Sequence, residues 1–183
     1  QTTRQPGSAM KILAAYAPAI VLGLITPNST SDDSPVLDLD GPWPSNSYGY
    51  YWGLEQVSKA VEQSSNAVAV RVLQELGIEQ AVAYLEDHFG FGEISEDDYG
   101  LSQLGLGGMT NGVTVLDMAA AYSVFPRDGV YLEPHTYTQV VDSNGKILLD
   151  NTDTEPQTAV KATTAWYVNQ MLRNVVSSPN GVG

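Results

Sequence analysis

A serine and a lysine three residues apart, Ser8 and Lys11, form the pair best suited to chemistry in this sequence. At this spacing on a helix, two side chains share a face. A serine hydroxyl is a poor nucleophile until a base removes its proton, and a lysine amine can be that base when burial or positive potential lowers its pKa. Free N–H groups at a helix N-terminus could also hold an oxyanion. Because S-x-x-K often occurs by chance, the alternative is a serine N-cap followed by an exposed lysine.

A second polar cluster, Ser64-Ser65-Asn66, lies at the junction of two segments with helical periodicity. It offers a hydroxyl that could relay a proton and an amide that could hold a peptide carbonyl. Serine and asparagine are also favoured N-cap residues. Taken alone, the cluster is therefore interpreted as the cap of the helix that follows it.

Other polar segments carry weaker signals. Gly105-Leu106-Gly107-Gly108 lacks the lysine of a P-loop and the spacing of a dinucleotide-binding loop, so a tight loop is the better interpretation. The acidic runs at residues 32–33 and 96–98 lack EF-hand spacing, so we expect solvated loop charge there and no cation site. The sequence contains no cysteine, which excludes thiolate metal sites, and we expect neither a metal nor a cofactor.

The composition is acidic, with 8 Lys and Arg against 21 Asp and Glu and a formal net charge of −13 over 183 residues. Sequence-independent nucleic-acid binding depends on Lys and Arg neutralising phosphates, so we expect no nucleic-acid partner. The same charge argues against docking to an anionic membrane surface. No apolar run reaches the roughly 20 residues of a membrane span, so no span is expected. The length fits one domain or a piece of a larger one.

The elements that must position these residues are mostly helical. Apolar periodicity, caps and glycine stops predict helices at residues 8–22, 54–63, 66–76, 79–89, 114–124 and 162–176. Alternation predicts strands at 130–141 and 146–149, joined by a hairpin turn at 142–145. Residues 26–51 are expected to be a long irregular connection, and residues 105–112 a glycine-rich loop. The sequence therefore predicts an α-rich α+β fold with one hairpin and no large central sheet.

Taken in order, these segments resemble the transpeptidase domain of class A penicillin-binding proteins. The resemblance runs through residues 4–11, which contain S-x-x-K, and residues 53–70, which contain S-x-N. It continues through the glycine-rich stretch and Gly112-Val113-Thr114 to residues 117–122 and 128–131. The resemblance implies the serine acyltransferase fold shared with class A β-lactamases, here without most of its central sheet.

The resemblance also implies roles for individual residues. Ser8 would be the acylated nucleophile, Lys11 its base and Ser64 a proton relay. Asn66 would hold a substrate amide, with Gly107 and Gly108 as weaker substrate-side assignments. The implied substrate is the D-Ala-D-Ala end of a peptidoglycan stem peptide, which β-lactams mimic, on the extracytoplasmic face of a bacterial cytoplasmic membrane. No metal or cofactor is implied.

One family motif, K-S/T-G on a strand, is missing from the sequence. We therefore expect residues 1–183 to be an internal segment of one transpeptidase domain, beginning at S-x-x-K and ending before K-S/T-G. The isolated chain is expected to be inactive unless a complementary fragment completes the sheet, and its exposed apolar faces favour self-association. Two alternatives remain open: a β-lactam or peptidoglycan sensor that uses the same residues but acylates without turnover, and a non-catalytic interaction module that keeps only the scaffold.

Overall fold

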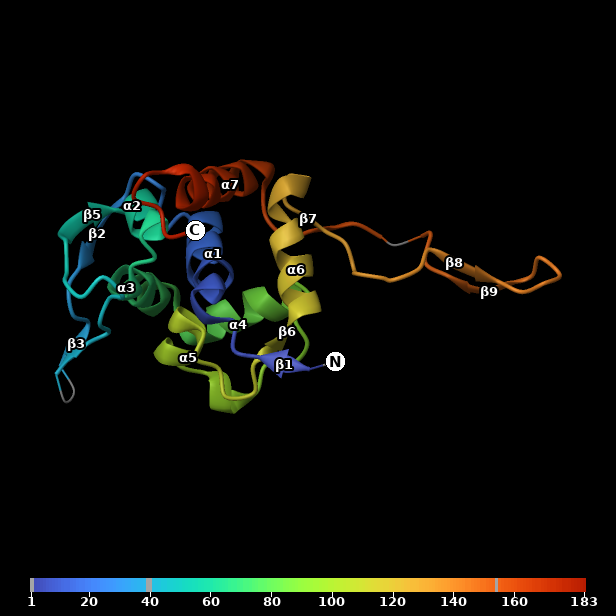
Figure 1. The fold of residues 1–183 in the computed structure, drawn as a ribbon, viewed down its shortest axis with the longest axis horizontal. Coiled ribbons are helices and arrows are strands. Elements are labelled where there is room, and N and C mark those ends of the chain that lie inside the picture. The colour runs from blue at the N-terminus through green and yellow to red at the C-terminus, as the bar shows by residue number, and fades with distance from the viewer. Residues whose placement is uncertain (1, 39–40, 154) are drawn as a thin grey trace.

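A helical body and one projecting hairpin make up the computed structural model, which describes residues 2–38, 41–153 and 155–183 (Figure 1). The helices are α1 Ala17–Val21, α2 Val57–Glu62, α3 Asn66–Leu76, α4 Ile78–Asp87, α5 Leu101–Leu106, α6 Val115–Ser123 and α7 Ala162–Ser177, with shorter helical turns η1 Gly7–Ala9, η2 Ile12–Tyr16, η3 Glu96–Asp98 and η4 Phe125–Arg127. The strands are β1 Thr3–Arg4, β2 Thr30–Asp33, β3 Leu37–Asp38, β4 Pro42–Trp43, β5 Gly53–Gln56, β6 Val113–Thr114, β7 Val130–Tyr131, β8 Gln139–Val141, β9 Ile147–Asp150 and β10 Gln157–Thr158.

The S-x-x-K segment enters the centre of the body. Every residue from Met10 to Ala17 is buried, as expected of a helix that is apolar all round. The helix predicted at residues 8–22 is present as three turns in succession: η1, the π turn η2, and α1. Pro18 has no N–H to donate, and the π turn lies just before it. α3, α4 and α5 pack against η2, and α7 packs against α1 (Figure 1).

Two helices begin and end where local signals predict. α3 spans Asn66–Leu76, with the Ser65 hydroxyl accepting from Val68 N–H at its start and Gly77 at φ 92° after its end. α6 begins with the predicted capping box between Thr114 and Asp117. The helix predicted at residues 79–89 is observed as α4, displaced by one residue at its start and ending at Asp87.

The prediction for residues 54–63 is wrong at its start. Residues 54–56 belong to β5, which pairs antiparallel with β2, and only Val57–Glu62 are helical. Strand pairing, and not burial of an apolar helix face, fixes this segment, because the β5 residue Leu54 is 77% exposed. The chain stays tied to the segment before β2 where α2 begins, since Val57 N–H donates to the Ser29 carbonyl. The connection at residues 26–51 is correspondingly less irregular than predicted, since it holds β2, β3 and β4; its residues 39 and 40 lie outside the described part.

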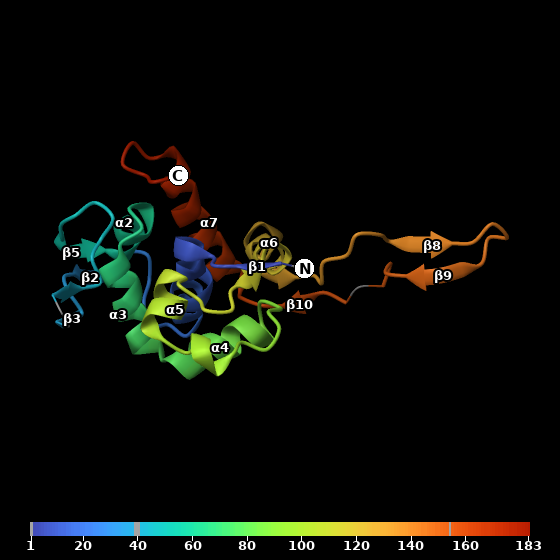
Figure 2. The same ribbon diagram turned by 60° about the horizontal axis from the view of Figure 1, so that its bottom comes forward.

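Two further predictions need correction. The strand expected at residues 130–141 is two separate strands: β7 pairs with β10, and β8 pairs with β9 in the predicted hairpin. This hairpin projects from the body in both views (Figures 1 and 2). The loop expected at residues 105–112 begins two residues later, because Gly105 and Leu106 complete α5. Gly105 has no Cβ, and one would lie only 3.2 Å from the Leu73 side chain of α3.

The described residues contain no large sheet. Their strands form five two-stranded ladders, so the predicted α-rich fold without most of its central sheet is confirmed. Within those same residues, no helix is both long and apolar enough to cross a membrane.

Candidate active site

Lys11 is the buried cation of the site. Its side chain extends toward the segment before α3, and the residue is 3% exposed. The Nζ atom donates to the Ser64 carbonyl at 2.8 Å, to Ser64 Oγ at 3.0 Å and to Asn66 Oδ1 at 2.5 Å. The structure therefore brings the S-x-x-K and S-x-N segments together at one amine.

Burial lowers the pKa of Lys11 to about 8. Three oxygen atoms match the three N–H bonds of the ammonium, so the charged form is hydrogen-bonded but poorly hydrated. Near neutral pH a fraction of Lys11 is then an unprotonated amine, as a general base requires.

The residues of the S-x-N segment have two different roles, capping α3 and contacting Lys11. Ser65, which is fully buried, caps α3 through its hydroxyl. Ser64 instead has φ 56°, a left-handed conformation that is uncommon for serine, and both its carbonyl and its hydroxyl face Lys11. The N-cap interpretation of the cluster is therefore right for Ser65, while Ser64 and Asn66 contact the lysine.

Ser8 lies in η1, one turn before Lys11, and is exposed. Within the described chain, its hydroxyl makes no hydrogen bond, including none to Lys11. Ser8, Lys11 and Ser64 nevertheless line one cavity of about 180 Å³. The remaining wall is mostly apolar and comes from η1, η2, α2, α6, α7 and the C-terminal segment: Ala9, Ile12, Tyr16, Val61, Tyr122, Leu172, Val175 and Val182.

Gly107 contacts the backbone of the S-x-x-K segment directly. It has φ +72°, its carbonyl accepts from Gly7 N–H at 3.2 Å, and a Cβ on it would lie 2.0 Å from the Gly7 carbonyl oxygen. Gly108 makes no such close approach, since its Cβ would be 3.6 Å from the nearest atom. The observed position of Gly107 is thus against the backbone before Ser8; a contact of Gly107 or Gly108 with substrate stays a prediction.

The expectation of solvated loop charge is wrong for two aspartates. Asp33 is 0% exposed and Asp98 is 1% exposed, and Asp98 accepts from the N–H groups of Thr110 and Asn111. Asp33 accepts from Ser65 Oγ at 2.7 Å, directly beside the S-x-N segment. No local pattern distinguishes Asp33 from Asp32, because burial depends on residues far away in the sequence.

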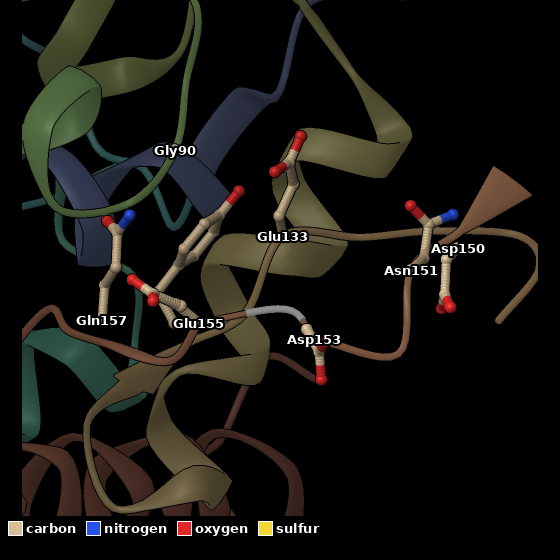
Figure 3. Close-up of a pocket in the computed structure, with 8 residues that line it drawn as sticks. Gly90, Glu133, Asp150, Asn151, Asp153, Glu155 and Gln157 are labelled. Carbon is tan, nitrogen blue, oxygen red and sulfur yellow. The ribbon is translucent and has the colours of Figure 1, made fainter.

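A larger hollow of about 600 Å³ lies at the base of the hairpin. Figure 3 shows its carboxylates spread out, with Glu133 and Asp153 pointing in different directions and Asp150 to one side. The hollow shares no residue with the S-x-x-K or S-x-N segments. It is lined by Gly90, Tyr131, Glu133, Asp150, Asn151, Asp153, Glu155 and Gln157.

The fold and the site together define a mostly helical domain with a serine–lysine pair. The family model described as "Penicillin binding protein transpeptidase domain" matches residues 1–183. The chain belongs to the penicillin-binding protein transpeptidase family.

Curated relatives agree with this assignment. The chain is 35% identical over 181 residues to penicillin-binding protein 4 of Bacillus subtilis, covering 99% of this chain and 28% of the relative. It is 34% identical over 184 residues to penicillin-binding protein 1A of Clostridium acetobutylicum, covering 96% of this chain and 22% of the relative. The chain thus spans about a quarter of the length of the curated relatives that it matches.

Solved structures show the same fold. The D,D-transpeptidase domain of a peptidoglycan glycosyltransferase from Eggerthella lenta matches with a TM-score of 0.78 and 25% identity, covering 97% of this chain and 49% of that one. Penicillin-binding protein 3 from Mycobacterium tuberculosis matches with a TM-score of 0.79 and 24% identity, covering 99% and 44%. The chain therefore corresponds to about half of each solved chain.

Proposed function

We propose that this chain is an internal segment of a peptidoglycan D,D-transpeptidase that acts through an acyl-serine on Ser8 and is acylated by β-lactams. The observation that carries the proposal is the buried Lys11 amine, hydrogen-bonded to Ser64 and Asn66 on the cavity that Ser8 also lines. Family membership supports the same reaction class. The proposed setting is the extracytoplasmic face of a bacterial cytoplasmic membrane.

In the acylation step, Ser8 Oγ attacks the carbonyl carbon of the penultimate D-Ala while unprotonated Lys11 takes the hydroxyl proton. The backbone N–H of Ser8, in the first turn of the segment, is proposed as one donor for the resulting oxyanion. The C–N bond to the terminal D-Ala then breaks, leaving an ester on Ser8. A β-lactam follows the same path, except that its leaving nitrogen stays attached through the opened ring.

Ser64 is suited to carry the proton to the leaving amine. Of the three oxygen atoms around Lys11 Nζ, only Ser64 Oγ bears a hydrogen and can both accept from the lysine and donate onward. The Ser64 carbonyl and Asn66 Oδ1 can only accept. Ser64 therefore links Lys11 to the leaving group, and in the second half-reaction it links Lys11 to the amine that attacks the ester.

Asn66 has one amide hydrogen left for a substrate. Its Nδ2 donates one N–H to the Ser45 carbonyl at 2.7 Å, and its Oδ1 accepts from Lys11. The second N–H has no acceptor in the part of the chain that the structure describes. A carbonyl of the stem peptide, or of a β-lactam side chain, fits this free donor.

The isolated chain is proposed to be incomplete and inactive without a complementary fragment. Its sequence has no K-S/T-G triplet, so the second oxyanion donor and the carboxylate site of the family strand must come from elsewhere. Loss of one oxyanion donor costs about 100- to 1,000-fold in rate. Binding a complementary fragment that carries this strand should restore much of that rate, and fluorescent-penicillin labelling with and without the fragment measures it.

A stem-peptide assay on the full-length protein that contains this sequence tests the function. The peptide ends in D-Ala-D-Ala, and free D-Ala and the peptide–amine product are quantified, with Ser8→Ala as the control. Ser8-dependent release of D-Ala with product formation supports the transpeptidase. Acylation of Ser8 without either product favours the sensor. Binding unchanged in a Ser8→Ala, Lys11→Ala, Asn66→Ala triple variant favours the non-catalytic module.

A further inference from the structure

A fully buried carboxylate lies behind the S-x-N segment. Asp33 is 0% exposed and accepts from four donors: Asn46 Nδ2 at 2.8 Å, Tyr48 OH at 2.9 Å, Trp52 N–H at 2.9 Å and Ser65 Oγ at 2.7 Å. In the described chain, no Lys or Arg forms an ion pair with it. Burying an unpaired carboxylate is costly unless its lone pairs are all satisfied. The four donors are therefore held in place by the charge that they surround.

Asn46 connects the buried Asp33 carboxylate to the start of α3. Its Nδ2 donates to Asp33 and to the Tyr50 carbonyl at 3.1 Å, while its Oδ1 accepts from Asn66 N–H at 2.8 Å. The opposite orientation of the amide would point oxygen at a carboxylate and nitrogen at an N–H. Asp33 thus fixes which way Asn46 faces.

The fixed orientation of Asn66 in turn places a hydrogen-bond acceptor at Lys11. Because Asn66 Nδ2 donates to the Ser45 carbonyl, its Oδ1 must face the opposite way, where it accepts from Lys11 Nζ. Ser45 and Asn46 are adjacent, so a single short segment holds both the backbone and the side chain of Asn66. The path of hydrogen bonds from Asp33 through Asn46 and Asn66 reaches the buried amine without interruption.

We propose that Asp33 and Asn46 are positioning residues that orient Asn66, and through it Lys11, for acylation of Ser8. The proposal rests on the proposed function for its catalytic meaning, although the orientation of Lys11 can be measured without any reaction. Groups that hydrogen-bond to the neighbours of a reacting side chain set how accurately that side chain is placed.

The first test follows Lys11 directly. The chain has four lysines, so 13C labelling at lysine Cε gives four NMR signals, and Lys11→Arg assigns the one that titrates near 8. In Asp33→Asn and Asn46→Ala, Lys11 should gain contact with water, and its pKa should rise toward the ordinary lysine value. Loss of the Asp33 charge alone would lower the pKa of Lys11, so an upward shift separates positioning from a simple charge effect.

The second test measures acylation of Ser8 by a fluorescent penicillin in the full-length protein. We expect Asp33→Asn and Asn46→Ala to react about 10- to 100-fold more slowly at pH 7, with the pH midpoint displaced upward. A merely structural role would lower the melting temperature without moving that midpoint. Burial and the charge of Asp33 raise the pKa of Glu55 to about 7, so Glu55 titrates in the same pH range. The NMR signal of Lys11 therefore decides which of the two groups causes a shift of the pH midpoint.

Asp32→Asn is the matched control, because it makes the same change one residue away at a half-exposed carboxylate. If Asp33→Asn and Asn46→Ala do not fold, Tyr48→Phe removes one donor to Asp33 and keeps the ring, and a smaller upward shift is expected. A Lys11 signal that still titrates near 8 in the folded variants overturns the proposal. A wild-type protein that never acylates Ser8 defeats the proposed function instead, and the NMR result still decides the positioning role.

Discussion

Lys11 shows how burial and hydrogen bonding give one residue two roles. Its ammonium is fully matched by oxygen atoms, yet its low exposure brings the pKa to about 8. The same contacts therefore hold the side chain in place and leave it able to lose a proton near neutral pH. A lysine on the surface would be fully protonated there and could not serve as a base.

The acylation rate should follow the unprotonated fraction of Lys11. A lowered lysine pKa means that the neutral amine increases as pH rises through about 8, so the rate should climb between pH 6 and pH 9. Lys11→Arg keeps the charge at all these pH values and should slow acylation by about 100-fold or more. Penicillin acylation rates across this pH range provide the measurement.

Glu55→Gln is the control for that experiment, since Glu55 has a pKa of about 7. It removes the competing titration and should leave the rise near pH 8 in place. A Lys11→Arg variant that acylates at the wild-type rate, with the same pH dependence, would rule out Lys11 as the base.

At the residue scale, the sequence points to the proposed reactive pair but not to its supports. S-x-x-K and S-x-N are short patterns whose members lie within three residues, so Ser8, Lys11, Ser64 and Asn66 can be named from the sequence. Asp33 cannot, because its burial depends on residues 46–52 and on Ser65 folding over it. The fold turns an ordinary acidic pair into one half-exposed and one buried carboxylate.

At the element scale, the S-x-x-K segment is held by its neighbours more than by its own helix. β1 pairs with β6, placing Arg4 opposite Val113, and Gly7 donates to Gly107 after α5. Ala9 accepts from the Tyr122 hydroxyl of α6 at 2.7 Å. Ser8 is therefore positioned by segments about 100 residues away in the chain.

Gly107→Ala should displace this segment. The added Cβ would lie 2.0 Å from the Gly7 carbonyl oxygen, and alanine at φ +72° is itself strained by about 1–2 kcal/mol. We expect a lower melting temperature and at least a tenfold slower acylation of Ser8. Thermal unfolding and penicillin labelling measure the two effects.

Two other glycines sharpen that test. Gly92→Ala has open space around its Cβ and should leave both readouts near wild type. Gly108→Ala fits sterically, so a loss of acylation without a loss of stability would indicate the predicted substrate contact. Wild-type behaviour of Gly107→Ala would show that the close approach to Gly7 does not position Ser8.

Prediction of the elements succeeds where local chemistry decides and fails where pairing decides. α3 is predicted to the residue because the Ser65 cap and the Gly77 stop are local. β5 is missed because Gly53–Gln56 become a strand through pairing with β2. α5 is not among the predicted helices, and its last two residues fall in the expected glycine-rich loop, because Gly105 resembles a loop residue while it packs closely against α3.

At the scale of the whole molecule, the chain presents helices without the large sheet that they accompany in its family. Its described strands form five separate two-stranded ladders, and the chain corresponds to about half of the solved transpeptidase chains that it matches. Large apolar side chains are correspondingly exposed, with Trp166 on α7 58% exposed and Leu148 on the hairpin 55% exposed. These surfaces support the proposed self-association or binding of a complementary fragment.

The hairpin should contribute to that self-association. Ile147 and Leu149 on β9 are 49% and 50% exposed, and replacing both with lysine should shift the isolated chain toward monomer in analytical ultracentrifugation. Ser143→Lys with Asn144→Lys adds the same charge at the turn without removing apolar surface, and should have a smaller effect. Equal sedimentation of the two double variants would assign the effect to charge alone.

The central claim is that Ser8 carries the acyl group, and one peptide tests it most directly. Trypsin releases residues 5–11, in which Ser8 is the sole hydroxyl side chain. After benzylpenicillin treatment of the full-length protein, mass spectrometry should find one penicilloyl group on this peptide and none in Ser8→Ala. Complete absence of the adduct from this peptide, or an adduct that persists in Ser8→Ala, would contradict the account.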